Sequence, residues 1–157
     1  MGSSRASIPL VHLEAILKKL FAVDRQRPGG SVALLVLRLI VGVAFTIIGY
    51  GKIQNPTGWM GPTPPIPGAL LALAAIAEFG GGISLLLGLL TRLGALGLLI
   101  TMIVAASFHI FVAGDPFINP TGGGSWQLAA VYAGVSLLYL ALGPGRFSLD
   151  RLIFGER

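Results

Sequence analysis

Long apolar segments dominate the chain, and short stretches rich in Gly, Pro and basic residues separate them. Four such segments occur, at about 31–50, 68–90, 91–113 and 126–142. Because an α-helix rises 1.5 Å per residue, about 20 residues cross a hydrocarbon core of roughly 30 Å. In lipid a span must satisfy its own backbone hydrogen bonds, as a helix does. The pattern predicts an all-α integral membrane protein, an antiparallel bundle of four transmembrane helices.

A shorter amphipathic stretch precedes these segments, at residues 8–21. Its apolar residues recur at helical spacing, and Lys18 and Lys19 lie between them. The stretch is too short and too charged to span a membrane, so it either lies in the headgroup region of anionic lipid or docks on the bundle. Pro28, Gly29 and Gly30 close the linker that follows. We therefore divide the chain into an amphipathic arm with its linker, 1–30, and a membrane domain, 31–157.

The composition supports a membrane protein. Hydrophobic residues make up 54% of the chain and charged residues 11%, whereas roughly a quarter of an average soluble domain is charged. The formal net charge is +5, but the basic residues lie at the ends of apolar segments and form no patch interleaved with aromatic residues. This distribution indicates contact with membrane lipid and no nucleic-acid partner. The chain has no cysteine, which excludes thiol redox chemistry and thiolate metal sites.

The basic residues also predict an orientation, because cytoplasmic flanks of transmembrane helices are enriched in Lys and Arg. Lys52 lies on one side of the predicted bundle, and Arg38 lies within a span. The other side carries Arg5, Lys18, Lys19, Arg25, Arg27, Arg92, Arg146, Arg151 and Arg157. We expect a multi-pass protein of the cell membrane with both termini in the cytoplasm.

The two predicted outer connections, 54–67 and 114–125, are rich in Pro and Gly. They either fold over the outer mouth of the bundle as a lid or form ordinary turns. Trp59 and Trp126 lie where aromatic belts meet the membrane surface. Small residues recur within the spans and allow close helix packing, either inside the bundle or between two copies in a homodimer.

Two ionisable residues fall within spans, Arg38 and Glu78. Each costs about 2.5–3.5 kcal/mol at the centre of a bilayer, so such residues are paired or functional. Arg38 is about seven residues from the inner end of the first span, and Glu78 is about ten residues from the outer end of the second. Both are therefore expected near mid-bilayer. An ion pair between them is one prediction, and participation in chemistry is the other.

Lys52, Glu78, His109 and Gln127, one from each span, are expected to converge in the outer half of the bundle. A histidine beside a carboxylate can relay a proton, so Glu78 and His109 are the candidate catalytic residues. One histidine and one carboxylate do not make a coordination sphere, so no metal site is predicted.

Several separated motifs resemble one family. They are Arg38-Leu-Ile-Val-Gly42-Val-Ala-Phe45, Gly49-Tyr-Gly-Lys52, Glu78 with the glycines after it, Gly88-Leu-Leu-Thr91-Arg92, and Gly143-Pro-Gly-Arg-Phe-Ser148-Leu-Asp150. In this order and on these spans, they resemble the DoxX family of small four-helix membrane proteins, over about 34–152. Many relatives place an acidic residue at the start of the fourth helix, where this chain has Gln127. The departure puts a second carboxylate role in doubt.

The resemblance implies a function, because the family includes a subunit of thiosulfate:quinone oxidoreductase and members associated with redox-stress complexes. We expect a membrane subunit of a quinone-linked oxidoreductase. The chain has no intrinsic cofactor motif, so it would bind a quinone or anchor a redox-protein partner that supplies electrons. Arg38, Lys52 and Gln127 are then the candidate ligand-binding residues. The alternatives are a non-catalytic membrane scaffold or assembly factor, and a small-molecule or ion carrier.

Overall fold

The computed structural model describes residues 10–156, and they are helical over most of their length. The elements are α1 (Leu10–Phe21), α2 (Pro28–Ile53), α3 (Gly68–Leu87), α4 (Thr91–Phe108), a π-helical turn η1 (His109–Ala113), α5 (Gln127–Leu142) and α6 (Leu149–Phe154). The predicted start of the first helix at Ile8, and the basic residues Arg5 and Arg157, lie outside the described residues.

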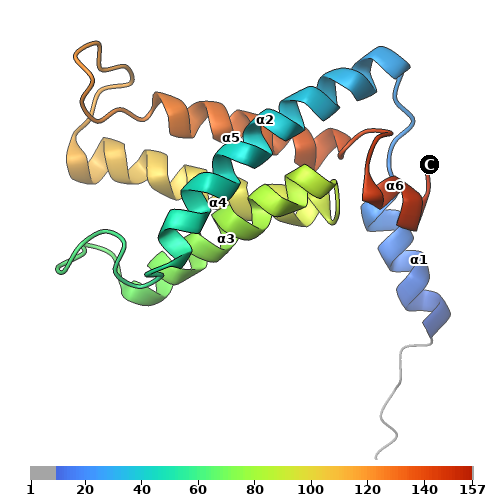
Figure 1. The fold of residues 1–157 in the computed structure, drawn as a ribbon, viewed down its shortest axis with the longest axis horizontal. Helices are drawn as coiled ribbons and strands as arrows, with labels where there is room; N and C mark the ends of the chain where they lie inside the picture. The colour runs from blue at the N-terminus through green and yellow to red at the C-terminus, as the bar shows by residue number, and fades with distance from the viewer. Residues whose placement is uncertain (1–9, 157) are drawn as a thin grey trace, which may run out of the picture.

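The bundle consists of two antiparallel hairpins, α2–α3 and α4–α5, that cross near their middles (Figure 1). At one end, which we call the loop face, the connections 54–67 and 114–126 diverge from each other. The other end, which we call the basic face, includes α1, the α3–α4 turn and α6. Its described basic residues include Lys18, Lys19, Arg92, Arg146 and Arg151. The first and last described helices, α1 and α6, lie together at this end, and the assignment of the basic face to the cytoplasm stays a prediction.

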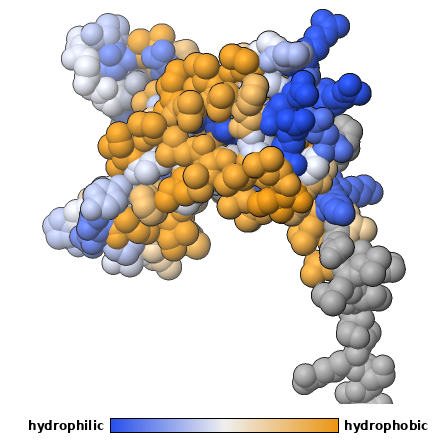
Figure 2. Space-filling view, turned by 45° about the vertical axis from the view of Figure 1, so that its right-hand side comes forward, coloured by the Kyte–Doolittle hydropathy of each residue, from blue (hydrophilic) through white to orange (hydrophobic). Residues whose placement is uncertain are grey.

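The chain is a membrane protein of several apolar helices. The helices α2, α3 and α4 with η1 are each long and apolar enough to cross a membrane. The fourth predicted span, α5, has 16 residues and so extends about 24 Å. Figure 2 shows a broad hydrophobic zone over the middle of the bundle, with hydrophilic residues towards its ends. On α2, α3 and α4 respectively, Ile47, Leu73 and Leu93 are each more than half exposed, as side chains that face lipid are.

The tightest helix contact joins α2 to α3 and depends on glycine. A Cβ added at Gly49 would lie 2.6 Å from the Cα of Phe79, and one added at Gly82 would lie 2.5 Å from the backbone nitrogen of Thr46. The two backbones therefore touch, and a side chain at either glycine would force them apart. These contacts fix the register of α2 against α3.

The arm α1 docks against α6 at the basic face. The Phe21 and Phe154 ring centroids are 5.4 Å apart, and the Val23 amide donates to the Gly155 carbonyl at 3.0 Å. Much of the apolar side of α1 nevertheless remains exposed, with values of 46% for Leu13, 50% for Ile16 and 54% for Leu20. The arm thus docks at its C-terminal end, as the docking alternative predicted, while its contact with the membrane interface stays a prediction.

The α2–α3 contact yields a stability prediction. We expect Gly49→Ala to lower the free energy of unfolding in detergent by about 1–3 kcal/mol, because the added methyl group overlaps the α3 backbone. Gly51→Ala is the matched control, since a Cβ there meets nothing within 4 Å. Alanine there should be neutral or stabilising by about 0.5–1 kcal/mol through helix propensity. Thermal unfolding followed by circular dichroism measures both, and equal effects would contradict the close contact.

Candidate functional site

Arg38 binds the segment that joins α5 to α6. Its guanidinium donates to the Pro144 carbonyl at 3.2 Å and to the Phe147 carbonyl at 2.6 Å, and the residue is 2% exposed. The helix α2 begins at Pro28 and continues past the end of α3 at the basic face. Arg38 therefore lies near the level of the α3–α4 turn and not at mid-bilayer as predicted.

The predicted Arg38–Glu78 ion pair is wrong. The register of α2 against α3 places Arg38 beside Gly88, at the end of α3, where a Cβ would overlap the guanidinium. Gly88 also has φ +65°, a backbone conformation that favours glycine. Glycine at position 88 therefore serves two purposes: it leaves space for the Arg38 guanidinium, and it adopts the positive φ with which α3 ends. Arg38 does not pair with Glu78. Its hydrogen bonds instead tie α2 to the segment between α5 and α6 at the basic face.

Asp150 makes the second closing contact of the basic face. Its carboxylate accepts hydrogen bonds from the Leu90 amide at 2.6 Å and the Thr91 amide at 2.9 Å, at the N-terminus of α4. Its own amide donates to the Gly88 carbonyl at 2.8 Å. A carboxylate at a helix N-terminus satisfies amides that have no intrahelical partner and complements the helix dipole. Sequence reasoning missed this role, although Asp150 ends one of the family motifs.

Lys52 and Glu78 form an ion pair near the loop face. The ammonium is 2.7 Å from Oε1 of Glu78, and the side chains are 21% and 2% exposed. The Trp59 ring covers Lys52, with its centroid 4.2 Å from the ammonium, and the indole donates to the Leu71 carbonyl at 3.1 Å. The connection 54–67 thus folds back so that Trp59 covers the Lys52 ammonium, and the choice between a lid and an ordinary turn stays a prediction.

The other carboxylate oxygen of Glu78, Oε2, is buried and has no hydrogen-bond partner among the described residues. A buried acceptor left unpaired costs about 1–3 kcal/mol. The α2–α3 contact places Glu78 here, because Gly49 lets the α2 backbone approach Glu78 and Phe79. The protein therefore maintains, inside its apolar bundle, a carboxylate oxygen that is able to accept a proton or a ligand hydrogen bond.

His109 has a different partner. Its Nδ1 is 2.7 Å from a carboxylate oxygen of Asp115, and the two side chains are 34% and 23% exposed. The turn η1 brings them together, with the Asp115 amide donating to the His109 carbonyl at 2.8 Å. Sequence reasoning missed Asp115, although an acid six residues after a histidine, beyond a glycine, was a usable signal.

Gln127 begins α5 on this second hairpin, and its amide donates to the Phe117 carbonyl at 3.0 Å. The expected convergence of four polar residues is therefore corrected. The structure divides them into an ion pair, Lys52 with Glu78, on the α2–α3 hairpin, and a His109–Asp115 contact on the α4–α5 hairpin. The hairpins diverge towards the loop face, so these groups occupy separate lobes (Figure 1). Within residues 10–156, no three His, Cys, Asp or Glu side chains gather as a metal site would need.

Comparisons with known proteins identify the family. The model of the DoxX family matches residues 33–113, slightly more than half of the chain. The chain belongs to the DoxX family. It is 34% identical over 129 residues to the inner membrane protein YqjF of Escherichia coli, covering 78% of this chain and 93% of that protein. No solved structure gives a significant match.

Two further DoxX relatives are similar over most of their length. An uncharacterized protein of Haemophilus influenzae is 32% identical over 134 residues, covering 84% of this chain and 96% of its own. The inner membrane protein YphA of Escherichia coli is 32% identical over 127 residues, covering 76% and 89%. The names of two of these relatives give a membrane location, and none of the three names gives an activity. Any activity must therefore be argued from the site itself.

The corrected partners can be tested by two double-mutant cycles on thermal stability in detergent. We expect Lys52→Gln and Glu78→Gln to couple by about 0.5–3 kcal/mol, because each removes the other's ion partner. Arg38→Gln and Glu78→Gln should instead add within about 0.5 kcal/mol, as separated sites do. Strong coupling in the second cycle would show that Arg38 and Glu78 interact directly, which would contradict the structure.

Proposed function

We propose that the protein is a membrane subunit of a quinone-linked redox complex, and that Lys52, Glu78 and Trp59 form its quinone headgroup site. The observation that carries the proposal is the unpartnered, buried Oε2 of Glu78. The ion partner of this carboxylate is 21% exposed and lies under an aromatic ring. The family resemblance supplies the substrate class.

The residues present fit a quinone. A quinone carbonyl accepts a hydrogen bond and a quinol hydroxyl donates one. Lys52 is a pure donor and ionised Glu78 a pure acceptor, so together they complement both forms of the ring. Trp59 offers a flat apolar surface beside them. The apolar lipid-facing flanks of α2 and α3 suit the isoprenoid tail that keeps quinones in the membrane.

When bound, a quinone accepts two electrons and two protons to become a quinol. Within the site, Lys52 would donate a hydrogen bond to the oxygen on which negative charge develops, which stabilises that charge in a dry environment. Ionised Glu78 would accept a hydrogen bond at Oε2 from a quinol hydroxyl. Once protonated there, it would pass that proton to the adjacent quinone oxygen as a general acid does, which supplies one of the two protons, and water at the loop face would supply the other. Trp59 would exclude water from the ion pair and orient the ammonium. The protonation of Glu78 would be renewed from the loop face, to which Lys52 is partly open.

The electrons must come from another protein, because the chain carries no flavin, haem or iron–sulfur motif. We therefore propose a partner that bears such a cofactor and docks on this subunit. The predicted cytoplasmic placement of the basic face remains part of this proposal, and it puts the ion pair in the outer half of the membrane. Arg38, His109 and Gln127 are not included in the headgroup site, because their contacts lie elsewhere.

Quinone binding can be measured by tryptophan fluorescence, since the chain has two tryptophans. In a Trp126→Phe variant, Trp59 is the single reporter. We expect a decyl-substituted benzoquinone to quench it saturably in lipid nanodiscs. Glu78→Gln in the same background should weaken that binding about tenfold or more, because Lys52 loses the ion partner that positions its ammonium for the charge-assisted hydrogen bond to the quinone carbonyl.

Two controls accompany this titration. His109→Ala in the same background should leave the affinity unchanged, because His109 is on the other hairpin. A Trp59→Phe variant, which leaves Trp126 as the reporter, should show only linear collisional quenching. Quenching of Trp59 that does not saturate, or that Glu78→Gln leaves unaltered, would refute the quinone site.

A second candidate function is a membrane scaffold or assembly factor. It is favoured by Arg38 and Asp150, whose hydrogen bonds to backbone groups close the basic face. On this reading the ion pair of Lys52 and Glu78 is a further structural tie between α2 and α3.

Recovery of the intact complex from its native membrane separates the two functions. If the protein binds quinone, Glu78→Gln should leave the partner polypeptides associated and abolish quinone reduction by the complex. If it is a scaffold, the same variant should retain both the partners and the activity of the complex. Mass spectrometry of the purified complex and a quinone reduction assay on the same sample provide the two readings.

A further inference from the structure

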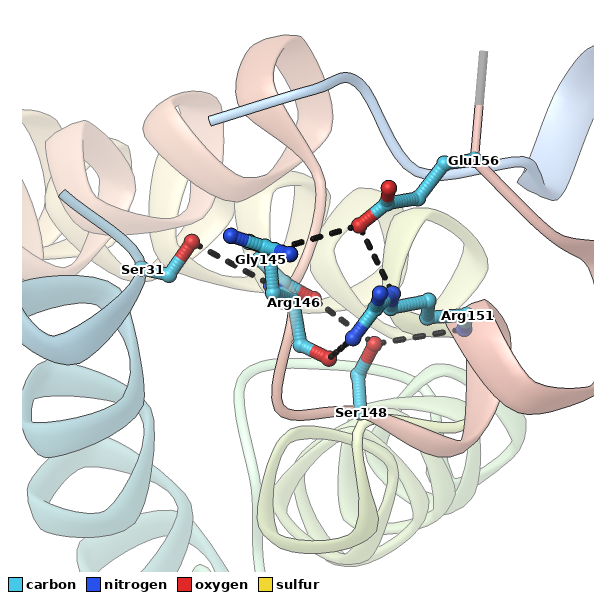
Figure 3. Close-up of polar contacts among 6 residues, drawn as sticks. All are labelled: Ser31, Gly145, Arg146, Ser148, Arg151 and Glu156. Carbon is cyan, nitrogen blue, oxygen red and sulfur yellow. Dashed lines mark hydrogen bonds and ion pairs between the residues drawn. The ribbon is translucent and has the colours of Figure 1, made fainter. Parts of the chain in front are cut away.

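A basic notch lies beside α6 at the basic face. Oε1 of Glu156 is 3.3 Å from Nε of Arg146 and 2.7 Å from Nε of Arg151, so one carboxylate oxygen binds two guanidinium groups (Figure 3). The two arginines can therefore hold one anionic oxygen between them, as they hold Oε1 of Glu156.

The two arginines are held in place through their backbone. The Arg146 amide donates to Oγ of Ser31 at 3.4 Å, and the Arg151 amide donates to Oγ of Ser148 at 3.3 Å (Figure 3). Ser148 in turn donates to the Gly145 carbonyl at 2.8 Å. Because Arg38 and Asp150 also hold this segment, the backbone positions from which the two arginine side chains extend are fixed before any ligand arrives.

The charge of the notch is not balanced internally. It contains two guanidinium groups and one carboxylate, Glu156, which leaves one positive charge. The nearby carboxylate of Asp150 is directed at the amides of Leu90 and Thr91. Each arginine contacts Glu156 through Nε, and a guanidinium has further donors suited to a second anion. A phosphodiester group, with one negative charge, would complete the balance.

The notch is a hollow of about 420 Å³, lined by Leu87, Arg146, Phe147, Ser148, Leu149, Arg151 and Leu152. An apolar groove adjoins it. A groove of about 400 Å³ runs between α3 and α4, and its lining is apolar except for Ser84. Leu87 lines both hollows. The groove includes Gly80, where an added Cβ would meet nothing within 4 Å, so space for an acyl chain adjoins the basic notch.

The surroundings of the notch are those of a membrane interface. Leu152 is 80% exposed and Ile153 57% exposed on α6, next to basic side chains. Apolar and basic side chains side by side are typical of surfaces that lie between headgroups and acyl chains. Basic residues near such a surface attract anionic lipid by about 1 kcal/mol each.

From these observations we infer that Arg146 and Arg151 bind the phosphate of an anionic phospholipid, whose acyl chain lies in the α3–α4 groove. Glu156 competes with the lipid for the same two arginines. This site is on the opposite face from Lys52 and Glu78 and does not depend on the function proposed for them.

Native mass spectrometry of the full-length protein in detergent, after delipidation, tests the inference. We expect phosphatidylglycerol to be retained at least about tenfold more tightly than phosphatidylcholine with the same acyl chains. The variant Arg146→Gln with Arg151→Gln should remove this preference. Arg25→Gln with Arg27→Gln is the control, because it removes the same charge from exposed positions outside the notch and should keep the preference.

Two single variants test the site without removing its arginines. Glu156→Gln should strengthen phosphatidylglycerol binding several-fold by removing the competing carboxylate. Gly80→Leu should weaken it by filling the groove, while the fold tolerates the side chain. Unchanged binding in both variants would overturn the inference, as would equal effects of the two double arginine variants.

A third measurement distinguishes a lipid from a small anion. Inorganic phosphate at millimolar concentration should leave the thermal stability of the delipidated protein unchanged, whereas phosphatidylglycerol should raise it. Equal stabilisation by phosphate would show that the notch recognises a free anion and would refute the lipid assignment.

Discussion

The close approach of α2 to α3 is the constraint on which the rest of this structure depends. Glycines at 49 and 82 let the two backbones touch, and each would be displaced by a side chain. Since the contact fixes how α2 is shifted along α3, it also decides the neighbours of the charges on α2. Arg38 contacts Gly88 at the end of α3 and binds two carbonyls of the segment between α5 and α6, and Lys52 pairs with Glu78. The hydrocarbon core cannot hydrate these charged groups, so each of them must lie within reach of a partner in the protein.

The polar groups of the bundle consequently have different roles. Asp150 and the two terminal nitrogens of the Arg38 guanidinium make their hydrogen bonds inside the protein and close the basic face. The ion pair of Lys52 and Glu78 leaves one buried carboxylate oxygen without a partner in the described part of the chain. Within the same residues, Arg38 also has one unpartnered buried atom, Nε, but a guanidinium does not release a proton, whereas a carboxylate can take one up. The proposed chemistry therefore rests on Glu78. At the basic face, two arginines sharing one carboxylate provide a separate place for an anion. Proton chemistry near one end and lipid recognition at the other are compatible with one small bundle.

Periodicity and composition were sufficient to predict the membrane bundle, because apolar segments of spanning length can be covered only by lipid. The family motifs were also readable in the sequence, and the family is confirmed. Residue partners were harder to predict. The depth of Arg38 was wrong because the apolar pattern does not reveal how far α2 shifts along α3. The four polar residues of the loop face were expected to converge because the spans were drawn as parallel rods, whereas the hairpins cross and diverge. Asp115 and Asp150 were missed because each acts on backbone or a side chain brought close by a turn.

The most direct test of this account is the distance between the Lys52 ammonium and the Glu78 carboxylate in a real bilayer. The chain has three lysines and three glutamates, so labelling lysine with ¹⁵N at Nζ and glutamate with ¹³C at Cδ is simple to interpret. Solid-state NMR of the reconstituted protein should show a strong dipolar coupling between the two labels that disappears in Glu78→Gln. A spectrum that Glu78→Gln does not change would mean that the ion pair does not form in lipid, and the proposed headgroup site would lose its basis.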